Sequence, residues 1–587
     1  SVISVACRLE FMINTIKDKL RAPIELTSKY GANKFVKLFI VSMLTLTLFI
    51  RAVLFANDHG AVEHDSGWYI GTAWNLANNY KYASLISTSY KPGVGASRSI
   101  HTRPIVQDKE GHNYFSAGVT VGPGYIIPQA ILFFIFGDGP WVNRAWPLMG
   151  YLLLVFFSLA TVYYLGNWLS LLAFFLFLYS TPRFSIQFAF EAFSEHIAVL
   201  FGLLAFIVFH INTFQNKRDY QKKWVYLVSG MLVSMSYLTK MLGLFIVPAF
   251  LTPFFMQMYQ SDNKKETLKL WFIWGFGILI PIIAYEAYRF LILTIKFGFS
   301  AWQASNEEIK SVLNSGGSGV SNLKNMSLEI FVGRWKVWKY AGIYESSAFG
   351  ILFILCLIGI IYFSKKKDRL INYHFITMGL PLVIWFCSLS KTGWFRHIWI
   401  GAWFVVMTLA IGWGYLSERQ REFSLKLWVF TIFTQGIYFS YVIFSTNPYF
   451  DMKYRLGASV VENWNNTRGY AGLPSVTLFD QKEQNEYVDW IVKNVKPEDT
   501  LFFDGWMLVA EIPPLIKRTT HCFSKYKEMR PTMKGKSYLM FGPYQLKSPI
   551  RIKDDKYVNT IKEAVCSKTV FKNPSYHLCE VDPEKHK

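Results

Sequence analysis

Long apolar runs alternate with polar segments along the chain up to about residue 446. Eleven of these runs predict transmembrane helices, because about 17–25 apolar helical residues cross the roughly 30 Å of a hydrocarbon core. A further run, residues 126–136, is about half that length and predicts a helix in the membrane interface. The eleven runs are residues 35–56, 141–165, 169–181, 193–213, 224–239, 241–259, 270–293, 347–364, 371–389, 398–416 and 427–445, of which 169–181 is the shortest.

Three polar segments are too long to be simple turns between spans. Residues 57–140 follow the first span, residues 296–346 follow the seventh, and residues 447–587 follow the last. In the last segment, the helical period of residues 487–495 and the strand-like pattern of residues 500–503 predict a small α/β domain. The predicted fold class is therefore an all-α polytopic membrane protein with about 11 transmembrane helices and a small α/β extra-cytoplasmic C-terminal domain.

The orientation of the chain in the membrane follows from its basic loops. With eleven spans, every loop rich in Lys and Arg falls on the same side of the membrane. That side also holds the tail, residues 1–34, so both are expected in the cytoplasm and the C-terminus outside. The tail lacks the short apolar core of a cleaved signal peptide, and either an interfacial helix or a solvated leader fits it. A bacterial inner membrane is the default location. The basic loop residues are Lys217, Arg218, Lys222, Lys223, Lys264, Lys265, Lys269, Lys365, Lys366, Lys367, Arg369, Arg419, Arg421 and Lys426.

The composition agrees with a membrane protein. The chain is 52% hydrophobic and 18% aromatic, but only 17% of its residues are charged, against about 25% in soluble domains. These values exclude a soluble globular protein and a disordered one. The net charge of +22 is explained by the basic cytoplasmic loops rather than by a nucleic-acid partner.

The outer loop after the first span carries the most informative polar cluster. It reads Glu63–His64–Asp65–Ser66–Gly67–Trp68–Tyr69 and is followed by a helical pattern that ends near Tyr80. Two acids two residues apart, where the chain leaves the membrane and ahead of an aromatic helix, favour a functional site over a lone helix cap.

Six segments in order over roughly residues 35–400 resemble the glycosyltransferase C superfamily, most closely the protein O-mannosyltransferases and the lipid A aminoarabinose transferases. They match the first-loop acidic signature, a Pro-Gly-Tyr segment, a Leu-Thr-Lys element, an Asn-Tyr-x-Arg-Phe element and a late Arg-Tyr element of those enzymes. The segments are Asp65-x-x-x-Tyr69 with Ala73, Leu76 and Tyr80–Lys81–Tyr82; Tyr114–Phe115; Gly122–Pro123–Gly124–Tyr125–Ile126–Ile127–Pro128 with Phe136–Gly137 and Arg144; Tyr237–Leu238–Thr239–Lys240; Glu286–Ala287–Tyr288–Arg289–Phe290; and Trp394–Phe395–Arg396–His397.

The resemblance implies a membrane glycosyltransferase that takes a sugar from a polyprenyl-phosphate donor and inverts the anomeric centre. Residues 35–446 would form the catalytic membrane domain. The acceptor would be a hydroxyl of a glycan, lipid or protein at the outer face, and a carboxylate would remove its proton. Asp65 is the implied base, with Glu63 as the second choice. The candidate cations for the leaving phosphate are Lys240, Arg289 and Arg396. The candidate substrate-binding residues are Tyr69, His64, Arg144 and Glu195, of which Glu195 could bind the acceptor or pair with a basic residue.

Each of these residues also has a structural interpretation. Asp65 can be a helix N-cap, and Lys240 can be a polar turn between two apolar helices. Arg289 and Arg396 can be interface anchors that extend to the headgroups. Glu195 can be half of a buried ion pair.

The cofactor and the disulfide stay open at this stage. A divalent metal is possible, because histidine and carboxylate ligands of mixed type lie in the first outer loop. Of three cysteines on the outer side, Cys522, Cys566 and Cys579, two can form one disulfide. The metal-ligand candidates are His59, His64, His101 and His112 with Glu63 and Asp65.

Two other classes of function compete with a glycosyltransferase. A secondary transporter or lipid-linked-sugar flippase would use Lys240, Glu191 and Glu195 as a relay within the membrane, but the inverted repeats it requires are not seen in the sequence. A lipid-diphosphate oligosaccharide polymerase or ligase would favour a large late outer loop over an acidic first one. The sequence does not identify the sugar, the acceptor, the prenyl length or the oligomeric state.

Overall fold

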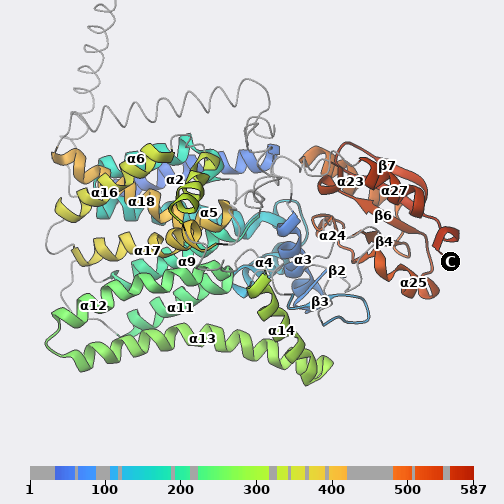
Figure 1. Ribbon diagram of the computed structural model, residues 1–587, viewed down its shortest axis with the longest axis horizontal. Coiled ribbons are helices and arrows are strands. Elements are labelled where there is room, and N and C mark those ends of the chain that lie inside the picture. Colours follow the sequence, from blue (N-terminus) through green and yellow to red (C-terminus); the bar gives the residue numbers. More distant parts are fainter. Residues whose placement is uncertain are drawn as a thin grey trace, which may run out of the picture.

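A bundle of helices runs along the long axis of the molecule, and the C-terminal domain lies at one end of it (Figure 1). The structure is a computed structural model. It describes residues 34–59, 62, 64–87, 106–116, 122–186, 192–211, 223–315, 327–341, 346–363, 369–390, 395–419, 480–504, 509–546 and 555–586.

Ten of the eleven apolar runs lie on helices, and the eleventh, 427–445, lies outside the described residues. Six helices in the described part of the chain are long and apolar enough to cross a membrane, and four more are apolar but shorter, so a count of eleven is not confirmed. The ten runs that are described lie on α2 (Lys34–His59), α5 (Ala145–Leu165), α6 (Trp168–Ser180), α9 (Glu195–Phe209), α11 (Lys223–Thr239), η3 (Met241–Phe250) continuing into α12 (Leu251–Gln260), α13 (Lys264–Phe297), α16 (Ser346–Phe363), α17 (Arg369–Ser388) and α18 (Phe395–Arg419).

The bundle has a buried centre and an apolar outside. In α18, 94% of the most apolar 18-residue stretch is buried, so this helix is central. In α13, Phe272, Phe276, Leu279 and Ile283 are all exposed. Their spacing of three or four residues places them on one face of the helix, and an exposed apolar face of this length is suited to lipid. The chain is an integral membrane protein.

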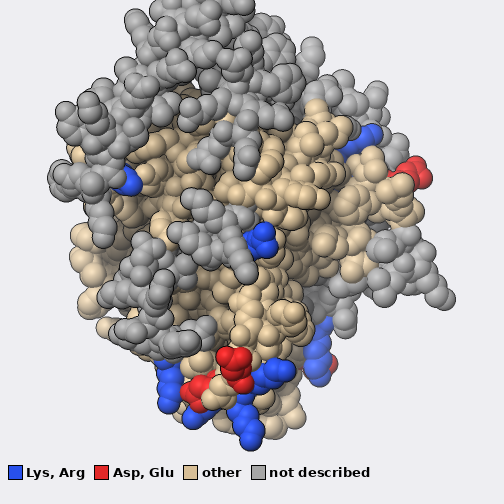
Figure 2. All heavy atoms as spheres, turned by 90° about the vertical axis from the view of Figure 1, so that its left-hand side faces the viewer, with Lys and Arg blue, Asp and Glu red and all other residues tan. Residues whose placement is uncertain are grey.

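Charge is concentrated at the end of the bundle far from the C-terminal domain. The turn between α12 and α13 lies at this end (Figure 1), and Lys264, Lys265 and Glu266 open α13 directly after it. Figure 2 looks onto this end and shows Lys, Arg, Asp and Glu gathered mostly along its lower edge, beside a large surface without charge. This basic loop and the C-terminal domain therefore lie at opposite ends of the bundle.

Shorter helices and strands surround the end of the bundle that faces the C-terminal domain. They are α3 (His64–Asn79), β1 (Ala83–Ser84), β3 (Asn113–Tyr114), α4 (Pro123–Phe136), η2 (Val142–Arg144) and α14 (Phe299–Ser315). α4 coincides with the interfacial helix predicted at residues 126–136. The predicted loop 296–346 is largely helical where it is described. It contains α14 as well as α15 (Leu328–Trp335) and η5 (Lys336–Ala341).

The C-terminal domain is the small α/β unit that the sequence predicts. Its sheet has the strand order β2-β5-β4-β6-β8-β7. The first four strands run parallel to one another, β8 is antiparallel to β6, and β7 is antiparallel to β8. The strands are β4 (Thr500–Phe503), β5 (Thr520–Cys522), β6 (Ser537–Phe541), β7 (Cys566–Lys572) and β8 (His577–Val581), and α23 (Gln481–Asn494), α24 (Ile512–Ile516) and α27 (Asp555–Val565) are its main helices. β2 (Ile86–Ser87) comes from the first outer loop, which therefore forms part of this sheet.

The outer cysteines behave as expected. Cys566 and Cys579 form a disulfide between the neighbouring strands β7 and β8, and Cys522 is a buried free thiol. The prediction of one disulfide among these three cysteines is confirmed.

Candidate functional site

Asp65 forms an ion pair with Arg396 across the boundary between α3 and α18. The guanidinium Nη1 of Arg396 donates to Oδ2 of Asp65, and the two side chains are 13% and 17% exposed. Asp65 lies in the first turn of α3, where the positive end of the helix dipole also favours a carboxylate. The sequence-predicted base and one of the predicted phosphate-binding cations are thus in direct contact.

A second ion pair lies beside the first. Nζ of Lys240 is 3.0 Å from Oε1 of Glu195, whose side chain is fully buried at the start of α9. The same Nζ lies 5.9 Å from the centre of the Tyr69 ring. Tyr69 is four residues after Asp65 on α3, so both project from one face of that helix. This face therefore points toward both ion pairs.

An aromatic contact extends the site to α4. The rings of Tyr69 and Tyr125 meet edge-on with their centres 5.5 Å apart. The Tyr125 hydroxyl donates to the carbonyl of Ala192, at 2.8 Å, close to the start of α9. Segments containing residues 65, 125, 195, 240 and 396 are therefore brought together, although they are far apart in the sequence.

Glycines explain how α4 reaches the Leu-Thr-Lys segment. A Cβ on Gly122 would lie 1.9 Å from the carbonyl oxygen of Leu238, and one on Gly124 would lie 2.2 Å from Oγ1 of Thr239. Larger side chains would push α4 away from the end of α11. The Gly-Pro-Gly turn is thus required for the two segments to touch.

Lys240 lies at a change of helix type. α11 ends at Thr239, Lys240 is extended with φ −144° and ψ 126°, and the chain continues as the ten-residue 3₁₀ helix η3. Runs of 3₁₀ helix this long are uncommon, and they often mark functional positions. The break turns the Lys240 side chain out of the helical register and toward Glu195. Lys240 is thus the polar break between two apolar helices that the sequence allowed, and it also has a buried carboxylate partner.

His397 also belongs to this site, and the sequence analysis did not assign it a role. It follows Arg396 on α18, is 5% exposed, and lies close enough for the charges of Arg396, Lys240 and Asp65 to act on its ring. The only signal in the sequence is its position next to Arg396.

Arg289 is held by a separate set of partners. It donates from Nε to Glu286 at 3.0 Å, from Nη2 to the same carboxylate at 2.7 Å, and from Nη1 to Oγ of Ser305 at 2.9 Å, with a further contact to Asn306. These bonds tie α13 to α14. The charges of Glu286 and Arg289 both act on Tyr237, three residues before Lys240, so this cluster borders the first site without joining it.

The remaining predicted residues are placed as follows. Arg144 is buried at the junction of η2 and α5. Glu63 and Glu191 lie outside the described residues. His64 opens α3, but its side chain lies outside the described part of the structure.

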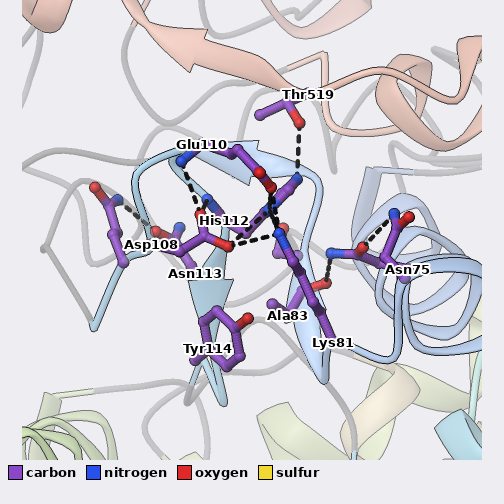
Figure 3. Close-up of polar contacts among 12 residues, drawn as sticks. Asn75, Lys81, Ala83, Asp108, Glu110, His112, Asn113, Tyr114 and Thr519 are labelled. Carbon is purple, nitrogen blue, oxygen red and sulfur yellow. Dashed lines mark hydrogen bonds and ion pairs between the residues drawn. The ribbon is translucent and has the colours of Figure 1, made fainter. Parts of the chain in front are cut away.

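A third polar cluster lies in the first outer loop (Figure 3). Ligand atoms of Asp108, Glu110 and His112 lie within 4.8 Å of one another, which is compatible with a metal ion. Nζ of Lys81 enters the same cluster, forms an ion pair with Glu110, and lies 3.0 Å from Oδ2 of Asp108 and 3.4 Å from Nδ1 of His112. Burial lowers the pKa of Lys81, but hydrogen bonds to Glu110 and Asp108 raise it overall, so the ammonium stays charged.

This cluster contains one member of the ligand set expected from the sequence. His112 is the one of the four proposed histidines whose side chain is described, and its carboxylate partners there are Asp108 and Glu110. Nε2 of His112 is 2.9 Å from Oγ1 of Thr519, so the cluster also ties the loop to the C-terminal domain. A metal ion would have to displace the Lys81 ammonium to bind there.

Comparison with known proteins gives matches in structure but not in sequence. No family model and no curated protein matches the chain. ArnT from Cupriavidus metallidurans in the apo state is similar over 95% of this chain and 99% of its own, with a TM-score of 0.58 and 12% identity. The same protein bound to undecaprenyl phosphate has a TM-score of 0.56 at 12% identity, over 94% of this chain and 100% of its own.

A second protein shares the arrangement more loosely. The Archaeoglobus fulgidus oligosaccharyltransferase in complex with Zn and sulfate is similar over 92% of this chain and 72% of its own, with a TM-score of 0.51 and 12% identity. ArnT and this oligosaccharyltransferase are both glycosyltransferase C proteins. The chain therefore has the glycosyltransferase C fold, as the order of its sequence motifs predicted.

Proposed function

We propose that this protein is a membrane glycosyltransferase that transfers a sugar from a polyprenyl-phosphate carrier to an acceptor hydroxyl at the outer membrane face. The observation that carries the proposal is the Asp65–Arg396 ion pair beside the Lys240–Glu195 pair. Support also comes from the fold shared with ArnT, which has been solved with undecaprenyl phosphate bound.

In this proposal Asp65 is the general base. The acceptor oxygen attacks the anomeric carbon, the bond from that carbon to the phosphate oxygen breaks, and the acceptor proton passes to Asp65. The carrier phosphate leaves with the bonding electron pair. The ionised carboxylate is the form that accepts a proton, and the Arg396 guanidinium lies directly beside it.

Arg396 and Lys240 are the proposed cations for the donor phosphate. Each is already paired with a carboxylate, so its charged head is fixed before the donor arrives and little reorganisation is needed. A phosphate between them would share both cations with Asp65 and Glu195. Arg289 stays a candidate phosphate ligand, but it would first have to exchange its bonds to Glu286 and Ser305.

The proposed substrate contacts use the remaining residues of the site. Tyr69, which is buried beside Lys240, and His64, which precedes Asp65, are the proposed contacts for the sugar or acceptor. Arg144, buried at the junction of η2 and α5, stays a candidate substrate-binding residue.

The decisive experiment uses purified protein in lipid nanodiscs with a radiolabelled polyprenyl-phosphate sugar. The wild-type protein is expected to consume the donor and release polyprenyl phosphate, whereas Asp65→Asn is expected to bind the carrier without consuming the donor. Glu307→Gln, which replaces an exposed acid on α14 whose ion-pair partner is the exposed Lys310, is the matched control. Turnover by Asp65→Asn at the wild-type rate would contradict the assignment of the base. Movement of intact donor across a vesicle without consumption would instead support the flippase alternative.

A further inference from the structure

We propose that the C-terminal domain positions the Asp65 base, and that Gln484 is the positioning residue through which it does so. The inference rests on the proposed function for the meaning of Asp65. Its structural part, a clamp on the chain just before Asp65, can be tested without any turnover.

Gln484 holds the backbone that enters α3. Its Oε1 accepts from the amide of Val62 at 2.9 Å, and its Nε2 donates to the carbonyl of Val62 at 2.9 Å. Val62 lies in the connection between α2 and α3, three residues before Asp65, and both Gln484 and Val62 are 2% exposed. One side chain of the C-terminal domain therefore satisfies both backbone polar groups of a buried residue, Val62, where either group left alone would be costly.

Further hydrogen bonds within the C-terminal domain fix the orientation of the Gln484 side-chain amide. Nε2 of Gln484 also donates to the Tyr576 hydroxyl at 3.2 Å, so both amide protons are in use. The Tyr576 hydroxyl in turn donates to Oε1 of Glu511 at 3.1 Å, and its ring stacks on Tyr487 with centres 4.8 Å apart. Turning the amide over would break three hydrogen bonds at once. The network therefore transmits the position of the C-terminal domain to Val62.

A second contact fixes α3 from its other side. A Cβ on Gly67 would lie 2.2 Å from the carbonyl oxygen of Ala510, and one on Gly71 would lie 3.6 Å from Cβ of Pro514. Further along, Nζ of Lys517 lies 5.6 Å from the centre of the Trp74 ring. These three α3 residues repeat at intervals of four and three, so they share one face of the helix.

That face is nearly opposite the one with the ion pair. Residues 65 and 67 are two positions apart, which at about 100° per residue is roughly 200° around the helix. Gly67 therefore contacts the C-terminal domain, while Asp65 and Tyr69 point toward Arg396 and Lys240. A shift of the C-terminal domain by 1 Å would move Asp65 by a similar amount, and misplacement of this size can reduce turnover about 100-fold.

The test compares Gln484→Met, which keeps the volume and loses all three hydrogen bonds, with Lys482→Met, an exposed position on the same helix. Hydrogen–deuterium exchange of peptides covering residues 62–70 is expected to rise at least 10-fold in Gln484→Met and to stay unchanged in Lys482→Met. Donor turnover is expected to fall 10- to 100-fold in kcat with the donor KM within 2-fold, since the phosphate cations are untouched. Gln484→Glu keeps the acceptor for the Val62 amide, so its exchange rate and its kcat are expected to lie between those of Gln484→Met and the wild-type protein.

A double variant separates positioning from general damage to the fold. In the Asp65→Asn background the base is absent, so adding Gln484→Met is expected to leave the residual turnover unchanged. A further fall in that background would overturn the positioning role. Unchanged exchange at residues 62–70 in Gln484→Met would overturn the clamp itself. A wild-type protein without turnover would contradict the proposed function, whereas the exchange result would still decide the clamp.

Discussion

Arg396 on α18 donates a hydrogen bond to Asp65 on α3, so residues 331 positions apart share one ion pair. The pair joins the central helix of the bundle to the first helix of the outer loop. Each partner has a separate use in the proposed reaction, since the carboxylate accepts a proton and the guanidinium holds a phosphate. Their contact places the proposed base and one proposed phosphate ligand side by side.

The first prediction concerns this pair. Asp65→Asn removes the base but keeps the shape, and it is expected to lower kcat by about 10²–10⁴-fold, the usual contribution of a general base. Arg396→Lys keeps the charge but loses the planar fork that binds carboxylate and phosphate, and it is expected to raise the donor KM as well. Radiolabelled donor consumption measures both. An Asp65→Asn variant that is impaired only in donor KM would show that Asp65 binds substrate and is not the base.

The second prediction separates structure from function at Lys240 and Glu195. Removing one member of a buried ion pair costs about 3–5 kcal/mol, because the other charge is left without a partner. Lys240→Met and Glu195→Gln are each expected to lower the thermal unfolding temperature, and the double variant is expected to recover most of it. Turnover should stay low in the double variant, since a phosphate ligand is missing. Recovery of turnover together with stability would mean that the pair is purely structural.

The sequence predicts the membrane helices and the members of the site better than it predicts their partners. Apolar runs are long and local, so their positions follow from length alone. The pairing of Arg396 with Asp65 and of Lys240 with Glu195 depends instead on how distant helices pack. The motifs named these residues, but no spacing in the sequence indicates which cation meets which acid.

The contacts of the C-terminal domain are the part that the sequence could not show. Gln484 lies in an ordinary polar segment and Glu511 in a short apolar one, and their roles depend on Val62, 422 positions away from Gln484. The β2 strand is too short to be recognised in a loop, yet it pairs with β5. One signal was available, because Gly67 and Gly71 form a Gly-x-x-x-Gly spacing that allows a close approach to one helix face.

The third prediction uses these two glycines as a matched pair. Gly67→Ala places a methyl group 2.2 Å from the carbonyl oxygen of Ala510, which is backbone and has little freedom to move. Gly71→Ala places it 3.6 Å from Pro514, an ordinary contact. Gly67→Ala is expected to separate α3 from the C-terminal domain and to lower turnover at least 10-fold, while Gly71→Ala stays near wild type. Equal turnover in the two variants would show that the close approach at Gly67 does not matter.

The fourth prediction tests the cluster of Lys81, Asp108, Glu110 and His112. The Lys81 ammonium already supplies a positive charge to both carboxylates. Lys81→Met removes it and leaves three potential ligands within 4.8 Å of one another. Zn²⁺ affinity, measured by calorimetry, is expected to rise at least 10-fold in Lys81→Met and to fall again when His112→Ala is added. Zn²⁺ binding by the wild-type protein that equals the variant's would show that Lys81 does not compete with a metal.

The fifth prediction concerns Glu511, a fully buried acid in the network that holds Gln484. Burial raises the pKa of its carboxyl from 4.5 to about 8, although hydrogen bonds from its own amide and from Tyr576 act in the opposite direction. Its pKa in the unfolded chain is lower than in the folded one, so the folded state binds more protons between these two values. The free energy of unfolding therefore falls as pH rises through this window, by at most about 1.4 kcal/mol per pH unit from this group.

Glu511→Gln keeps the hydrogen-bond acceptor for Tyr576 and removes the titration. It is expected to raise the unfolding temperature at pH 8 relative to wild type, with little difference at pH 4.5, where the wild-type carboxyl is protonated in the folded state and half protonated in the unfolded one. Glu528→Gln, on the short helix that precedes β6, serves as the control and should follow the wild-type curve. Thermal unfolding between pH 4.5 and 9 measures the effect. A Glu511→Gln curve parallel to that of wild type would mean that Glu511 is ionised in the folded protein at neutral pH, and the buried network would then have to stabilise a charge.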